Sequence, residues 1–111
     1  MDKEKLLKNL YAELKKGSIV LIVLAKLHNK YYGYSLVQTL SDDHFAIDQN
    51  TLYPLLRRLE EQGLLNSSWE VSDPRPRKYY EISPLGKEVY LALKETYLKN
   101  TNIINNLIKE H

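Results

Sequence analysis

Residues 50–63 read NTLYPLLRRLEEQG. The leucines at positions 52, 55, 56 and 59 have the spacing of one face of an α-helix, so this segment is predicted to be a helix that packs its leucines inward. Asp48 or Asn50 can cap its start, and Gly63 suits the position just after its end. Pro54 lies near the first turns, where a missing N–H costs least. If Asp48 is the cap, the proline lies deeper in the helix and is expected to distort its start.

A β-hairpin is predicted directly after this helix. Residues 64–72 and 78–82 have the β-branched and aromatic content of two short strands. Residues 73–77, DPRPR, form the loop between them, because two prolines at that spacing exclude ladder pairing. We expect the inner face of the hairpin to carry Trp69, Val71, Tyr80 and Ile82.

Helices are also predicted on both sides of this unit. A first amphipathic helix ends near Gly17. Residues 19–27 are apolar almost all round, so periodicity alone does not separate a buried strand from a buried helix, but positions 25–27 extend the run toward helical length and we interpret it as the central buried helix. Gly33 is expected to supply the permissive backbone for a sharp turn into a short helix that stops around residues 41–44. Ser83-Pro84 is a typical helix start, and this last helix can run to the final residues. The apolar stripes are Leu6, Leu7, Leu10, Tyr11 and Leu14 in the first helix and Leu36, Val37 and Leu40 in the short one.

This order of elements indicates a mainly α fold with a small two-stranded β-wing. Three helices followed by a hairpin are the order of a winged helix-turn-helix, to which N- and C-terminal dimerisation helices are added. We assign residues 1–83 to a DNA-binding domain that includes the N-terminal helix, and residues 84–111 to a C-terminal dimerisation helix. In such folds the second helix of the pair, here residues 50–62, enters the major groove of DNA.

Composition narrows the function classes. The chain has 111 residues and a formal net charge of +2, so it is expected to be one weakly basic domain. It has no cysteine, which excludes disulfides and thiolate chemistry and favours a reducing cytoplasm. The longest apolar run, Ile19–Ala25, is far short of a membrane span, so no membrane association is expected. The cluster Asp42-Asp43-His44 with Asp48 is interpreted as a helix end and cap, so we expect no enzyme activity, metal or cofactor.

With its leucines turned inward, the 50–62 helix leaves five side chains for solvent or DNA: Asn50, Thr51, Tyr53, Arg57 and Arg58. Asn can bond adenine, Thr can meet a thymine methyl, and Arg can bond guanine or a phosphate. The alternative is a polar face that is merely solvated. Arg75, Arg77 and Lys78 form a dense basic cluster on the proline-stiffened hairpin tip, which suits a wing on the DNA backbone, whereas the alternative is a solubilising loop.

Several stretches together resemble the PadR family of transcriptional regulators. They are KGS at 16–18, YGY at 32–34, NTLYPLLRRLEEQGLL at 50–65 and RPRKYY at 75–80, with Ser83 and Gly86. The likeness runs from about Leu14 to Gly86, and Asn50 stands where the family signature often has glycine. The resemblance implies a dimeric repressor that leaves a pseudo-palindromic operator when a small molecule or a stress signal acts, and the single last helix is similar to the compact subgroup. It places at double-stranded DNA the residues Tyr34, Ser35, Asn50, Thr51, Tyr53, Arg57, Arg75, Arg77 and Lys78. Tyr53 and Tyr79 can equally be half-buried packing.

The last helix carries an apolar stripe that calls for a partner helix. The winged domain can cover only part of it, so the rest is expected to pack in a homodimer. Asn100 falls on the same seam, where it can set register or simply be exposed. The expected interface comprises Leu7, Leu10, Tyr11, Tyr90, Leu93, Tyr97, Ile104 and Leu107.

Two further interpretations stay open. Some compact PadR proteins bind flat aromatic compounds at the dimer interface, so Tyr11 and Tyr97 are candidates for a small aromatic effector site. They can instead be ordinary interface aromatics. Winged helices also serve as protein-interaction modules, and the basic wing speaks against that alternative here.

Overall fold

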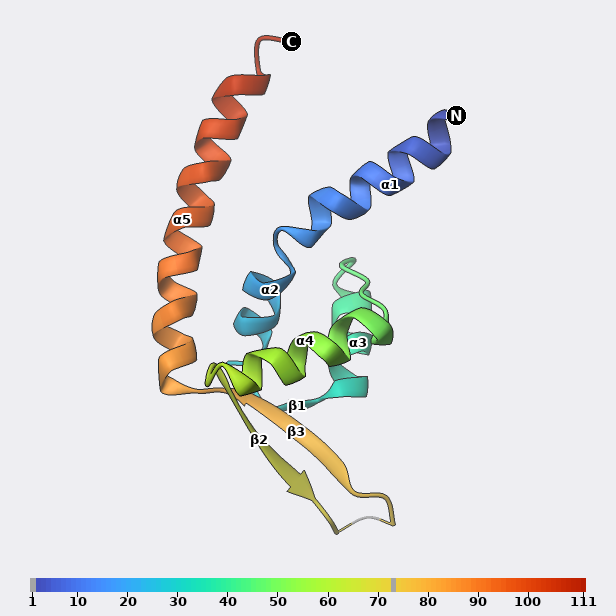
Figure 1. The fold of residues 1–111 in the computed structure, drawn as a ribbon, viewed down its shortest axis with the longest axis vertical. Helices are drawn as coiled ribbons and strands as arrows, with labels where there is room; N and C mark the ends of the chain where they lie inside the picture. The colour runs from blue at the N-terminus through green and yellow to red at the C-terminus, as the bar shows by residue number, and fades with distance from the viewer. Residues whose placement is uncertain (1, 73) are drawn as a thin grey trace.

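The computed structural model describes residues 2–72 and 74–111 as five helices and three strands (Figure 1). Met1 and Asp73, which the sequence assigned to the first segment and to the hairpin loop, lie outside the described residues. The elements are α1 Lys3–Lys16, α2 Ile19–Lys26, β1 Tyr31–Tyr32, α3 Gly33–Asp42, α4 Gln49–Glu61, β2 Leu65–Glu70, β3 Arg77–Ile82 and α5 Pro84–Ile108.

The core lies between α2, α3, α4 and the base of the hairpin. Val23 and Leu24 of α2 are fully buried, which confirms α2 as the central buried helix. All four stripe leucines of α4 are buried, as their spacing predicted, and the fully or nearly fully buried set also includes Leu27, Leu36, Leu40, Ile47, Leu65, Tyr80 and Ile82.

Both ends of α4 are fixed by local hydrogen bonds. Asp48 is the N-cap, and its Oδ1 accepts a hydrogen bond from the Thr51 N–H at 2.9 Å. With Asp48 as the cap, Pro54 lies deep in the helix, where a distortion was expected. α4 nevertheless continues past Pro54 to Glu61. At the other end Gly63 has φ +80°, and the N–H of Leu64 donates to the Leu59 carbonyl, which is the closing bond of a Schellman motif.

The sheet has three strands rather than the two expected for the wing. Its order is β1-β3-β2, with both pairs antiparallel. The added strand β1 pairs Tyr31 with Tyr80 and Tyr32 with Tyr79. A strand of two residues is too short to show an alternating pattern, so the sequence did not reveal it.

Of the four residues predicted for the inner face of the hairpin, two are buried and two are exposed. Tyr80 and Ile82 are buried, but Trp69 is 63% exposed and Val71 is 72% exposed. The reason is that the hairpin extends beyond the body of the molecule, below α4 in Figure 1, so its outer half has no helix to pack against. Along β2, burial alternates only from Leu65 to Ser68, and the residues beyond are all exposed.

The first turn of α5 packs closely on the end of α4. Ser83 caps α5 by accepting the Gly86 N–H at 2.9 Å and donates its own hydroxyl to the Gly63 carbonyl at 2.6 Å. A Cβ on Gly86 would lie 2.1 Å from the Leu64 carbonyl oxygen, so this contact requires glycine. The base of α5 is thereby fixed to the winged unit.

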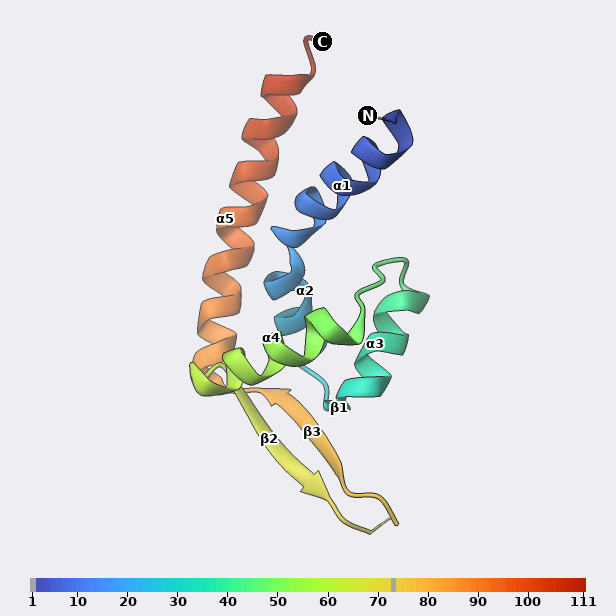
Figure 2. The same cartoon turned by 45° about the vertical axis from the view of Figure 1, so that its right-hand side comes forward.

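Farther along, α1 and α5 project away from the winged unit as two separate arms (Figures 1 and 2). The Cα radius of gyration is 16.4 Å, whereas a compact chain of this length is expected to have about 13 Å. Every residue of α1 is exposed except Lys15, which is half-buried. The apolar stripes of both arms therefore lack a covering partner within the described chain.

Candidate nucleic-acid interface

The outer side of α4 presents polar residues in three rows. Asn50 and Arg57 are exposed and lie seven residues apart, on the ridge opposite the buried leucines. Thr51 and Arg58, also exposed, lie on the flank toward α1 and α2, where both line a hollow with Lys16 and Ile19. Tyr53 lies on the opposite flank, toward the hairpin.

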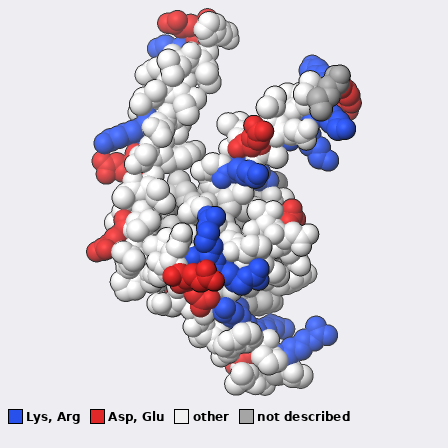
Figure 3. Space-filling model, in the orientation of Figure 1, with Lys and Arg blue, Asp and Glu red and all other residues white. Residues whose placement is uncertain are grey.

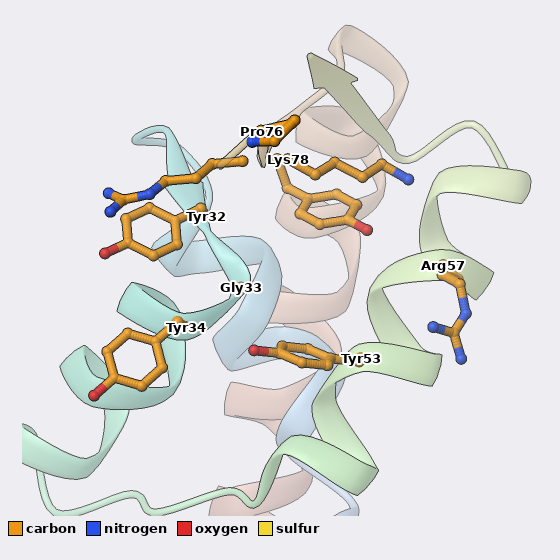
Figure 4. A pocket seen from close by; sticks show the side chains of 9 residues that line it. Tyr32, Gly33, Tyr34, Tyr53, Arg57, Pro76 and Lys78 are labelled. Carbon is orange, nitrogen blue, oxygen red and sulfur yellow. The ribbon is translucent and has the colours of Figure 1, made fainter. Parts of the chain in front are cut away.

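Three elements meet at a pocket of about 320 Å³, the tyrosine pocket (Figure 4). Tyr34 comes from α3, Tyr53 and Arg57 from α4, and Arg77 and Lys78 from β3, so five residues selected from the sequence are brought together. The structure adds lining residues that the sequence reasoning missed: Tyr32, Gly33, Pro76 and Tyr80.

Aromatic contacts hold one wall of the tyrosine pocket. The Tyr32 and Tyr34 rings are stacked at 6.4 Å, and Tyr79 meets Tyr32 edge-on at 5.6 Å. The Arg77 guanidinium lies over the Tyr32 ring at 4.9 Å, a cation–π contact that orients the arginine. Tyr79 is thus half-buried packing.

Gly33 is needed for space rather than for its backbone freedom. A Cβ at this position would lie 2.6 Å from Cε1 of Tyr53, and among the described glycines only Gly63 has a positive φ. The expectation of a permissive backbone at Gly33 was therefore wrong. Tyr53 both packs against the start of α3 and lines the tyrosine pocket, so the two interpretations of this residue are compatible.

Ser35 acts within its own turn. It is half-buried, and its hydroxyl donates to the Tyr32 carbonyl at 2.9 Å. This bond fixes the first turn of α3 and leaves the neighbouring Tyr34 exposed.

The three basic residues of the hairpin differ in their surroundings. Arg75 and Arg77 are exposed, whereas Lys78 is half-buried and its Nζ lies 2.9 Å from Oε1 of Glu60. The hydrogen bond to Glu60 raises the pKa of Lys78 against the opposing effect of burial. Hydrogen bonds from Ser67 and then from Lys78 lower the pKa of Glu60. Lys78 is therefore neutralised in part, whereas Arg75 and Arg77 remain as the exposed cations near the hairpin tip.

Figure 3 shows the resulting charge pattern. Lys and Arg side chains gather over α4 and the hairpin, and acidic side chains lie among them. Among residues 2–72 and 74–111, no group of three or more His, Cys, Asp or Glu side chains is placed to hold a metal ion.

The residues expected at a dimer interface lie on the two arms, with one exception. Leu7, Leu10 and Tyr11 of α1 and Leu93, Tyr97, Ile104 and Leu107 of α5 are exposed, as is Asn100. Tyr90 instead packs on its own chain, with its ring 4.8 Å from that of His28. Tyr11 and Tyr97 line one groove of about 360 Å³ between the arms, the α1–α5 groove, together with Leu14, Phe45, Thr101 and Ile104 among others.

Comparison with known proteins places this arrangement in a family. The model of the transcriptional regulator PadR-like family matches residues 20–92, which include α2 except its first residue, α3, α4, the hairpin and the start of α5. The chain belongs to the PadR-like family of transcriptional regulators.

Individual PadR relatives agree with this assignment. The chain is similar to a PadR family transcriptional regulator from Eggerthella lenta, with 36% identity, a TM-score of 0.93, and 97% of this chain and 96% of that one covered. It is also similar to a transcriptional regulator from Clostridium thermocellum, with 28% identity, a TM-score of 0.80, and 87% and 99% covered. Transcriptional regulator Rv3488 of Mycobacterium tuberculosis is 42% identical over 59 residues, which span 53% of this chain and 55% of that relative.

The PadR assignment identifies the chain as a DNA-binding transcriptional regulator of winged-helix fold, whose relatives are regulators and not enzymes. In the described part of the chain, the helices are too short or too polar to cross a membrane.

Proposed function

We propose that the protein is a homodimeric repressor that binds a pseudo-palindromic operator, with α4 in the major groove and the hairpin on the adjacent backbone. The observation that carries this proposal is the tyrosine pocket, which gathers α3, α4 and hairpin side chains on one surface. Asn50 and Arg57 would read base edges from the ridge of α4. Arg75 and Arg77 would hold phosphates, and Tyr34 shares the tyrosine pocket with Arg77.

The exposure of α1 supports a dimer. A helix of 14 residues is marginal in isolation, and α1 buries almost nothing on its own chain. A second copy that covers α1 and the outer part of α5 would bury the apolar stripes of both. In this proposal residues 1–83 bind DNA, and residues 84–111 together with α1 hold the dimer. Two α4 helices one DNA turn apart would then match the two halves of the operator.

The α1–α5 groove supports a site for a small aromatic effector. Its walls carry Tyr11, Tyr97 and Phe45, which offer flat apolar surfaces to an aromatic ring. Because its two sides belong to the arms that form the proposed dimer, an occupant would change the angle between α1 and α5. That change would alter the spacing of the two α4 helices and release the operator.

A reporter assay separates repression from other outcomes. The DNA upstream of the protein's own gene is fused to a reporter, and the protein is supplied in trans. We expect lower expression with the wild type and restored expression with Arg57→Ala. Higher expression with the wild type would mean activation, and unchanged expression without selective DNA binding would favour the protein-interaction module.

A further inference from the structure

We propose that Glu60 is a positioning residue that sets the angle between α4 and the hairpin, so that both can contact DNA at once. This inference rests on the proposed function, because it assumes that α4 and the hairpin bind the same DNA site. Glu60 contacts the hairpin within the chain and is not proposed to contact DNA.

One carboxylate connects α4 to both strands of the wing. Oε2 of Glu60 accepts a hydrogen bond from the Ser67 hydroxyl on β2, and Oε1 lies 2.9 Å from Nζ of Lys78 on β3. Ser67 pairs with Tyr80 and Lys78 pairs with Trp69, so both partners lie on the same face of the hairpin, two register steps apart. We call this set of contacts, Glu60 with Ser67 and Lys78, the wing clamp. Figure 4 shows Lys78 reaching from the hairpin toward the α4 side of the tyrosine pocket.

The wing clamp lies where the hairpin leaves the body. Closer to the base, Leu65 and Ile82 are buried in the core, whereas Trp69, which lies opposite Lys78, and Val71, farther out, are exposed. At the other edge of the hairpin, the Arg77 guanidinium lies over the ring of Tyr32, which belongs to β1 and not to α4. In the described chain, the clamp is therefore the outermost side-chain hydrogen bonding between α4 and the hairpin.

A small change at the wing clamp is amplified at the tip. Arg75 lies three residues beyond Lys78, in the loop before β3, and three residues of extended chain span at most about 10 Å, so a rotation of about 10° at the clamp would move it by up to about 2 Å. Hydrogen bonds to phosphate have a narrow distance range, and a shift of that size breaks them. The clamp side chains are about 30% exposed, so its value for overall stability is small and its main effect is on geometry.

Charge alone makes the opposite prediction, which gives a sharp test. Glu60→Gln removes a negative charge beside the DNA-facing surface, so simple electrostatics predicts tighter binding. The wing clamp predicts weaker binding, because glutamine cannot pair with Lys78 as a carboxylate does. Glu61→Gln is the matched control, since Glu61 is adjacent, exposed and equally charged.

The experiment measures DNA affinity of the full-length variants over a salt series. For Glu60→Gln we expect about tenfold weaker binding. The slope of log K against log salt should be less steep by about 2, because each of the two hairpins in a dimer would no longer bind one phosphate. Glu61→Gln should keep the wild-type slope. Ser67→Ala changes no charge and should weaken binding in the same direction, whereas Ser68→Ala, on the opposite face of β2, should not.

The single tryptophan provides an independent readout. Trp69 pairs with Lys78, so its emission in the free protein should change in Glu60→Gln and Ser67→Ala but not in the two controls. If Glu60→Gln does not fold, the comparison of Ser67→Ala with Ser68→Ala decides the question. If the wild type binds DNA selectively and Glu60→Gln binds as tightly as Glu61→Gln, the positioning role is wrong. If the wild type shows no selectivity, the proposed function itself fails.

Discussion

Leu10→Ala should weaken dimerisation far more than its position on an exposed arm suggests. Leu10 is 57% exposed on α1, and in the proposed dimer the partner covers that surface. Full burial of a leucine side chain stabilises by about 1.5–3 kcal/mol, so covering the remaining half is worth about 1–1.7 kcal/mol. A symmetric dimer contains this contact twice, which gives about 2–3 kcal/mol. The dimer Kd should therefore rise about 30- to 150-fold.

Sedimentation equilibrium over a concentration series measures this Kd directly. Asn9→Ala is the matched control, because Asn9 is the exposed neighbour of Leu10, lies off the apolar stripe of α1, and alanine favours the helix at both positions. The control should dimerise like the wild type, and helix content should be equal at concentrations where all three are dimers. A wild-type protein that is monomeric at tens of micromolar, or an unchanged Kd for Leu10→Ala, would refute the proposed interface.

Three further predictions concern the fold and its pH dependence. Leu56→Ala, at a buried position of α4, should lower the free energy of unfolding in urea by about 2–5 kcal/mol. Gly86→Ala should destabilise by about 1–3 kcal/mol or more, because its Cβ meets the Leu64 carbonyl oxygen and backbone cannot yield as a side chain would. Glu60 has a lowered pKa in the folded protein. The stability that its carboxylate contributes is therefore fully present above the ordinary glutamate pKa and is lost as the pH falls through the lowered value. Glu60→Gln should therefore be less stable than the wild type by under about 1 kcal/mol at pH 7, and a urea series should show the difference vanish in acid.

Helices with a clear apolar period could be predicted from sequence because burial enforces the period. The stripe from Leu52 to Leu59 predicted α4 correctly, and Gly63 predicted its end. The segment of α2 is apolar almost all round, so its length and not a period indicated a helix. The choice between Asp48 and Asn50 as cap was open, since both residue types favour that position and only the geometry of the loop selects one.

Features that depend on contacts distant in sequence could not be predicted. Trp69 has the residue type of a buried strand, but its exposure depends on how far the hairpin extends past α4. The need for glycine at position 33 arises from the Tyr53 ring, twenty residues later, and not from its own φ. The pairing of Glu60 with Lys78 likewise requires knowledge of the hairpin angle. Residue types in the sequence thus selected five of the nine residues that line the tyrosine pocket, and the contacts that arrange them came from the structure.

The most direct test of DNA reading by α4 is fluorescence anisotropy with the DNA upstream of the protein's own gene and a random duplex of equal length. Wild type, Arg57→Ala and Arg58→Ala are compared over a salt series. Both variants lose one exposed arginine of the same helix, but Arg57 lines the tyrosine pocket and Arg58 lies on the flank toward α1 and α2. We predict selective, salt-sensitive binding by the wild type, a loss of at least about tenfold with Arg57→Ala at the specific site, and a smaller, non-selective loss with Arg58→Ala. Equal losses on both duplexes for both variants, or a wild type that does not distinguish the duplexes, would contradict the assignment of α4 as the reading helix.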